Sequence, residues 1–217
     1  MICHVNGISL YYEVCGSGPP ILLVHGNGES HKIFDVVVPK LREHFTVYAV
    51  DSRCHGQSDH PAQVSYDLMA SDLIAMIRTL KLEKPIFYGY SDGGILGLLI
   101  AMREPQLLGK LIVSGANLNP AGMKRTTLWL SRLEALTGNK LARMMVREPR
   151  ISPEALHLIA VPTVILAGEK DVIRPEHTRL IASHIPGSTL KILKGETHGS
   201  YIVHSEKLWP ILRPYLL

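Results

Sequence analysis

Short apolar runs alternate along this chain with longer segments whose apolar residues recur at helical spacing. Residues 21–24 and 86–88 are unbroken apolar runs that lead into glycine-containing loops, which is typical of buried strands. The expected strands are residues 8–14, 21–24, 46–50, 86–88, 110–114, 161–166 and 189–193, and the expected helices are residues 33–42, 68–80, 92–103, 176–184 and 204 onward. This alternation predicts an α/β fold with a mostly parallel central sheet covered by helices on both faces.

Residues 116–158 interrupt the alternation because they contain no strand pattern. Two helices are expected there, one over residues 123–136 and one over residues 141–146, which stops before Pro149. No internal repeat, low-complexity tract or linker divides the chain. We therefore expect a single domain of residues 1–217, with 116–158 as a short helical lid inserted within it.

The composition, with 46% hydrophobic and 19% charged residues, is that of a folded globular protein. The apolar stretch at residues 95–102 is far shorter than the roughly 20 residues of a membrane span. The N-terminal residues lack the pattern of a secretory signal, so we expect a cytoplasmic location and no membrane span. Three widely spaced cysteines, Cys3, Cys15 and Cys54, predict reduced thiols and no disulfide framework.

The formal net charge of +4 is concentrated in one part of the sequence. Residues 116–160 contain seven Lys or Arg residues and three Glu residues, which accounts for the whole excess. These basic residues lack the interleaved aromatics of a nucleic-acid surface, so nucleic acid is not an expected partner. The pairs Cys3-His4 and Cys54-His55 have no second ligand pair at a metal-binding spacing. We expect neither a metal nor a cofactor.

The segment Gly89-Tyr90-Ser91-Asp92-Gly93-Gly94 directly follows a predicted buried strand and precedes an apolar helix. The pattern G-x-S-x-G between a strand and a helix is the context of a nucleophile elbow, in which glycines let the two elements approach closely. The positive end of the helix would face an oxyanion formed at the serine. A glycine-rich turn with an incidental serine has the same five-residue pattern, so the decision rests on partner residues.

A serine hydroxyl needs a base within hydrogen-bond reach to act as a nucleophile. Of the eleven histidines, His198 lies in the loop after the last predicted strand, which places it at the same sheet edge as Ser91. Asp171 directly follows the strand at residues 161–166 and is the expected orienting carboxylate. Glu169 is the nearest competitor, but its side chain would leave the strand end too early. The other candidate histidines, His157, His177, His184 and His204, are expected at the surface or in the core.

With these residues the chain resembles the α/β-hydrolase family from about residue 5 to residue 213, and the chain order Ser, Asp, His matches it. The motifs that carry the resemblance are His25-Gly26-Asn27-Gly28 and residues 51–59, 89–94, 168–171 and 195–198. The resemblance implies an oxyanion hole formed by the backbone amides of Asn27 and Asp92. It also implies structural roles for His25 and for the loop at residues 53–58. Serine at the nucleophile position argues against the dehalogenase and epoxide hydrolase members, which use Asp there.

The leading functional hypothesis is hydrolysis of an ester or thioester of a small or medium acyl substrate by water, through an acyl-enzyme on Ser91. Hydrolysis of a carbon–carbon or amide bond, or acyl transfer, would use the same residues. A receptor that binds a small ligand without turnover is the alternative from another class, although an intact triad counts against it. The basic residues of 116–158 would favour an anionic substrate or form the solvated faces of helices, whereas Asp92 would favour a cationic one.

Overall fold

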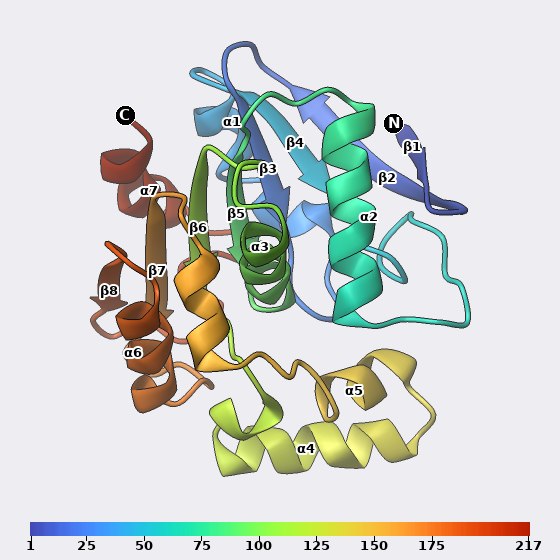
Figure 1. Cartoon of the computed structure of the whole chain (residues 1–217), viewed down its shortest axis with the longest axis vertical. Helices are drawn as coiled ribbons and strands as arrows, with labels where there is room; N and C mark the ends of the chain where they lie inside the picture. Colours follow the sequence, from blue (N-terminus) through green and yellow to red (C-terminus); the bar gives the residue numbers. More distant parts are fainter.

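The computed structural model describes residues 1–217, and a single eight-stranded sheet runs through it (Figure 1). The strands are β1 (Ile2–Val5), β2 (Ile8–Cys15), β3 (Pro20–Val24), β4 (Thr46–Val50), β5 (Ile86–Tyr90), β6 (Lys110–Ser114), β7 (Thr163–Gly168) and β8 (Thr189–Leu193). Their order across the sheet is β1-β2-β4-β3-β5-β6-β7-β8. Strand β2 is antiparallel to β1 and β4, and every other pair is parallel. The predicted mostly parallel sheet is confirmed.

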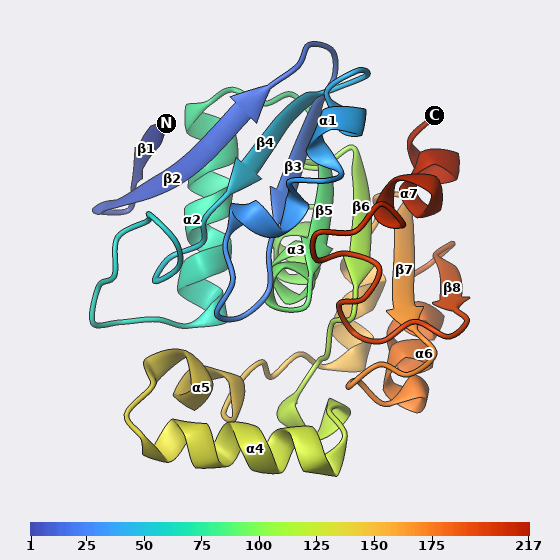
Figure 2. The ribbon, with the colours of Figure 1, turned by 180° about the vertical axis from the view of Figure 1, so that it is seen from behind.

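Helices cover both faces of this sheet. Helices α2 (Tyr66–Thr79), α3 (Asp92–Arg103) and α6 (Pro175–His184) lie on one face, and α1 (Val38–Leu41) and α7 (Leu208–Leu216) lie on the other (Figures 1 and 2). The position of β3 between the two layers of helices explains why its sequence is uniformly apolar. Leu22 and Val24 pack into the core under α2 and α3, whereas Ile21 and Leu23 pack into the core under α1 and α7. Successive side chains of a strand point to opposite faces, so both sets need to be apolar.

The segment between β6 and β7 contains the 3₁₀ helix η2 (Pro120–Gly122), α4 (Arg125–Leu136), α5 (Lys140–Met145) and the 3₁₀ helix η3 (Pro153–Leu158). Helices α4 and α5 lie across the end of the molecule toward which the parallel strands point (Figure 1). The Asn139 side chain caps α5 by accepting hydrogen bonds from the amides of Leu141 and Ala142. Helices α4 and α5 therefore lie over the carboxyl ends of the strands, whereas η3 packs beside α3 and α6 on one face of the sheet (Figure 1). No strand occurs among residues 116–158.

Three local predictions differ from the structure. A strand over Ile2–Val5 was not expected, and it pairs with β2 through Asn6-Gly7, both of which have positive φ, as a two-residue hairpin turn requires. The helix expected at residues 33–42 is two short pieces, the 3₁₀ helix η1 (His31–Phe34) and α1. Pro39 explains the break, because proline has no amide hydrogen and fits only the first turn of a helix. The last helix starts at Leu208, because His204 has φ of 49° and cannot lie in a right-handed helix.

Two further sequence-based expectations concern the thiols and the membrane. Cys3, Cys15 and Cys54 are all free, and they form no disulfide bond. Among the helices, none combines the length and the apolar character that a bilayer crossing needs.

A buried ion pair joins the loop after β4 to α2. The Arg53 Nε and Nη2 atoms donate to the two carboxylate oxygens of Asp72 at 2.7 and 2.9 Å. The Arg53 and Asp72 side chains are only 6% and 2% exposed. The Asn6 amide, from the hairpin turn between β1 and β2, donates to the same carboxylate at 3.0 Å. The Asp72 carboxylate thus links α2 to the loop after β4 and to the hairpin turn.

We expect Asp72→Ala to lower the free energy of unfolding by about 3–5 kcal/mol, because it leaves the Arg53 guanidinium buried without a counter-ion. Asp67→Ala is the matched control, since Asp67 pairs with Arg103 at the surface and is 77% exposed. Its cost should be at most about 1 kcal/mol. Urea denaturation of both variants measures the difference. Equal costs would show that the Arg53–Asp72 pair does not hold these segments together.

Candidate active site

Ser91 occupies the tight turn between the end of β5 and the start of α3, with φ of 53° and ψ of −113°. Non-glycine residues rarely adopt this conformation, so the surrounding structure has to enforce it. The neighbouring glycines allow the close approach. A Cβ on Gly89 would lie 2.1 Å from the Gly93 carbonyl oxygen, and one on Gly93 would lie 2.2 Å from the Val24 carbonyl oxygen. The sequence G-x-S-x-G therefore lets β3, β5 and α3 pack while Ser91 points away from the sheet edge.

His198 and Asp171 come from two other loops at the same edge of the sheet. His198 follows β8, and its Nε2 atom lies 3.1 Å from Ser91 Oγ. Asp171 follows β7, and its Oδ1 atom lies 2.7 Å from His198 Nδ1. The structure thus brings the three side chains singled out in the sequence into one continuous hydrogen-bonded chain. Because a carboxylate can only accept, it keeps the hydrogen on Nδ1 and leaves Nε2 free to accept the Ser91 hydrogen.

Asp171 is 3% exposed and is held as a charged group. Its oxygens also accept hydrogen bonds from the amides of Ile173 and Gly168. Burial raises the pKa of Asp171, but the hydrogen bond and charge of His198, together with these two amides, outweigh it and hold the pKa below its usual value. The Glu169 carboxylate instead accepts from the Gly195 amide and lies at the surface.

The loop after β3 lies beside the nucleophile. The backbone N–H groups of Asn27 and Asp92 donate to no other group of the chain. The Asn27 side-chain amide donates to Asp92 Oδ2 at 2.8 Å, and the Tyr66 hydroxyl donates to Asp92 Oδ1 at 2.7 Å. Burial raises the pKa of Asp92, against the opposing hydrogen bonds from Asn27 and Tyr66. Both Asp92 oxygens are thus occupied in fixing the loop to the start of α3.

The other histidines have different surroundings. His25 donates to the Gly26 carbonyl and accepts from the Ser52 amide, and burial with the nearby His55 lowers its pKa to about 3. It lies under the loop as a neutral hydrogen-bonding group. His177 Nε2 accepts from the Leu118 amide in the interior, and exposed His204 pairs with Asp35. No group of three or more His, Cys, Asp or Glu side chains is arranged to hold a metal ion.

Two residues that support His198 were not found from the sequence. The Tyr90 ring lies against the imidazole, with ring centroids 5.0 Å apart. Gly115, after β6, has φ of 65°, and a Cβ there would lie 2.7 Å from His198 Cε1. The only sequence signal was a glycine directly after a predicted strand. A glycine at this position is required because the imidazole passes directly over its backbone.

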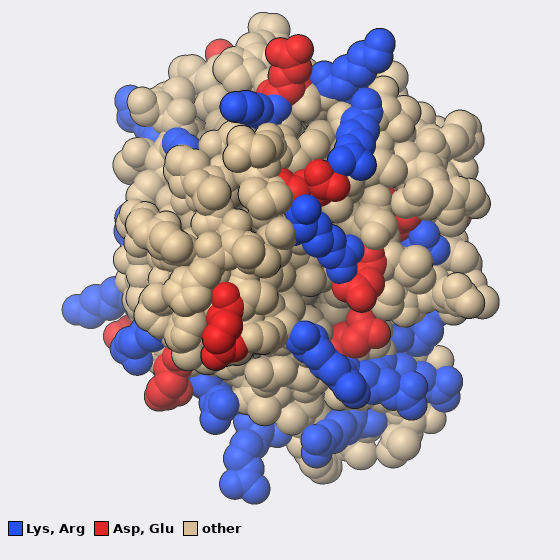
Figure 3. Space-filling view, in the orientation of Figure 1, with Lys and Arg blue, Asp and Glu red and all other residues tan.

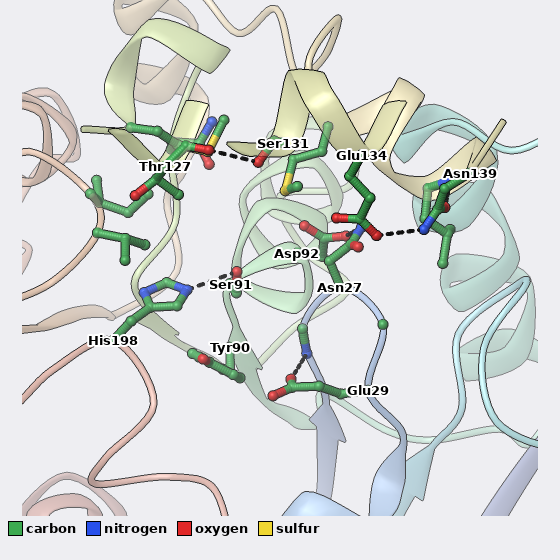
Figure 4. A pocket seen from close by; sticks show the side chains of 18 residues that line it. Asn27, Glu29, Tyr90, Ser91, Asp92, Thr127, Ser131, Glu134, Asn139 and His198 are labelled. Carbon is green, nitrogen blue, oxygen red and sulfur yellow. Dashed lines mark hydrogen bonds between the residues drawn. The ribbon is translucent and has the colours of Figure 1, made fainter. Parts of the chain in front are cut away.

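A pocket of about 380 Å³ opens over Ser91 and His198 (Figure 4). Helix α4 forms its far wall with Thr127, Ser131 and Glu134, and the Glu134 carboxylate accepts a hydrogen bond from Asn139. Glu29 and Asp92 also line the pocket, whereas no lysine or arginine does. Burial raises the pKa of Glu29. The basic residues of 116–158 therefore do not contact a ligand in this pocket, and they can act on it only from a distance.

A family model described as the α/β-hydrolase fold matches residues 19–131, which is just over half of the chain. A curated relative, the human serine hydrolase BPHL, is 28% identical over 98% of this chain and 84% of its own length. Among solved structures, the esterase EaEST from Exiguobacterium antarcticum has a TM-score of 0.86 and 24% identity, covering 99% of this chain and 97% of that one.

The meta-cleavage product hydrolase from Pseudomonas fluorescens IP01 has a TM-score of 0.78 and 20% identity, covering 96% of this chain and 93% of that one. At these identities the solved structures support the fold alone. The family match, however, covers strands β3 to β6, the turn at Ser91 and the start of the inserted segment. The chain belongs to the α/β-hydrolase fold family.

Proposed function

We propose that this protein hydrolyses carboxylic esters or thioesters through an acyl-enzyme on Ser91, with His198 as the general base and Asp171 as the orienting acid. The observation that carries the proposal is the hydrogen-bonded chain from Asp171 through His198 to Ser91 at the floor of a pocket. A hydroxyl within 3.1 Å of a correctly oriented imidazole is the arrangement that nucleophilic catalysis needs. The similarity to the human protein named serine hydrolase BPHL agrees with this proposal.

The first half-reaction forms the acyl-enzyme. Ser91 Oγ attacks the carbonyl carbon of the substrate while its proton passes to His198 Nε2. The free amides of Asn27 and Asp92 donate to the oxyanion of the tetrahedral intermediate. The intermediate collapses as its bond to the alcohol or thiol breaks, and His198 returns its proton to the leaving oxygen or sulfur. Asp171 remains ionised and stabilises the imidazolium during this step.

The second half-reaction restores the enzyme. Water enters the pocket and gives a proton to His198 Nε2 as its oxygen attacks the acyl carbon. The second tetrahedral intermediate collapses, the carboxylic acid leaves, and Ser91 Oγ regains its proton from His198. Cleavage of an amide or a carbon–carbon bond, or transfer of the acyl group to another acceptor, would follow the same steps with a different leaving group or acceptor. The substrate panel in the experiment below distinguishes these reactions.

We expect Ser91→Ala to reduce turnover of p-nitrophenyl esters or acyl-CoA thioesters of graded chain length by about 10⁴–10⁶-fold, because it removes the nucleophile. The fold should persist, as circular dichroism can verify. Steady-state kinetics of the wild type and the variant measure this loss of turnover. Binding of these compounds without turnover by the wild type would support a receptor. Turnover by the wild type of amides or of carbon–carbon substrates alone would replace the ester assignment.

Asp171→Asn should lower kcat by about 10³–10⁴-fold, because an amide nitrogen donating to Nδ1 would favour the wrong imidazole tautomer. Glu169→Gln is the matched control, since Glu169 is two residues away in the same loop but contacts Gly195. Its activity should stay near that of the wild type. A larger loss in Glu169→Gln than in Asp171→Asn would show that Glu169 is the orienting acid.

The pocket carboxylates predict that a substrate with its own carboxylate is disfavoured. We expect kcat/KM for an anionic ester to be about fivefold lower than for a matched neutral ester. Two like charges roughly 10 Å apart repel by about 1 kcal/mol at intermediate dielectric. Glu134→Gln should reduce this difference, because Glu134 projects into the pocket from α4. A preference for the anionic ester that fades at high salt would instead support long-range attraction by the basic residues of 116–158.

A further inference from the structure

Helix α4 turns polar side chains toward the rest of the protein and apolar side chains toward solvent. Thr127, Ser131 and Glu134, spaced i, i+4 and i+7, turn polar side chains toward the pocket (Figure 4). At the same spacing Trp129, Leu133 and Leu136 are 59%, 43% and 80% exposed. A surface helix of a globular protein ordinarily turns its apolar side inward and its polar side outward. The packing of this chain therefore does not account for the apolar residues of α4.

These three residues form a patch that no other part of the chain covers. Leu130 is also 59% exposed, and it lies on the flank of the same helix. Scattered single apolar residues are normal on a protein surface, but a contiguous group on one helix face indicates an interaction site. The partner that covers this patch has to come from outside the chain.

The charge around the patch indicates the kind of partner. Arg125 and Arg132 lie on the exposed side of α4, and Arg143 of α5 is exposed nearby. Of the three acidic residues in the segment, Glu134 faces the pocket, Glu148 accepts from the Tyr66 amide, and Glu154 lies in η3, outside α4 and α5. Lysine and arginine side chains accordingly gather at the end of the molecule that α4 and α5 form (Figure 3). Two such basic surfaces would repel one another, which disfavours a second copy of this chain as the partner.

We propose that the outer face of α4, defined here as Trp129, Leu133 and Leu136 with Arg125 and Arg132, docks on an anionic phospholipid surface. A helix with tryptophan and leucine on one face and basic residues beside them is suited to lie in the plane of a bilayer interface. Tryptophan favours the headgroup level, and each arginine there gains from the negative surface potential. The pocket is on the opposite side of α4, so docking needs no change in Ser91, Asp171 or His198.

The test measures binding of the full chain to vesicles by sedimentation. Vesicles of mixed phosphatidylglycerol and phosphatidylcholine should bind the protein at least tenfold more strongly than phosphatidylcholine vesicles, since each basic residue contributes about fivefold. Binding should weaken in 1 M salt, where the screening length falls to about 3 Å. In a Trp209→Phe background, Trp129 is the only tryptophan, and its emission should shift to the blue when anionic vesicles are added.

The double variant Trp129→Ser with Leu133→Ser should lose at least tenfold in vesicle binding. Its turnover of a soluble ester should equal that of the wild type, because neither side chain lines the pocket. Leu158→Ser is the matched control, since Leu158 is 60% exposed in η3 of the same segment and should bind as the wild type does. The proposal is overturned by equal binding to neutral vesicles, or by an equal loss in the Leu158 variant. It is also overturned by a wild-type dimer that the double variant dissociates.

Discussion

The left-handed turn at Ser91 is the constraint on which the rest of the site depends. It places the nucleophile at the junction of β5 and α3, above the edge where the parallel strands end. The turn is possible only because Gly89 and Gly93 let the backbones of β3, β5 and α3 approach to distances that any Cβ would prevent. Since β5, β6, β7 and β8 all run parallel to one another, the loops after β7 and β8 open at the same edge as the turn after β5. Asp171 and His198 lie in these two loops, and their side chains therefore reach Ser91.

Asp92 connects this turn to the loop after β3. Its carboxylate accepts hydrogen bonds from the side chains of Asn27 and Tyr66. The first residue of α3 is thereby bonded to both the loop after β3 and the start of α2. The two amides proposed to stabilise the oxyanion belong to Asn27 and Asp92 themselves. Their relative position is therefore set by the partly buried hydrogen bond between Asn27 and Asp92, and it needs no binding energy from the substrate.

The fold and the three central residues were predictable from the sequence because each depends on local signals. Unbroken apolar runs marked the buried strands, and Ser91, Asp171 and His198 directly follow strand ends in chain order. The contacts of Tyr66 and Gly115 were not predictable, because they join segments distant in sequence. Which side of α4 faces the pocket could likewise not be predicted from the sequence. Its charge and apolar residues were visible, but only the tertiary structure shows that its polar side faces the pocket and its apolar side faces solvent.

The most direct measurement of the central claim, that Ser91 is the nucleophile, is labelling with a fluorophosphonate followed by intact-mass and peptide mass spectrometry. The account predicts one adduct per chain, located on Ser91, and none in the Ser91→Ala variant. Labelling should also be far slower in His198→Ala, because the hydroxyl then lacks its base. An adduct that persists in Ser91→Ala, or that maps to another residue of the wild type, would contradict the account.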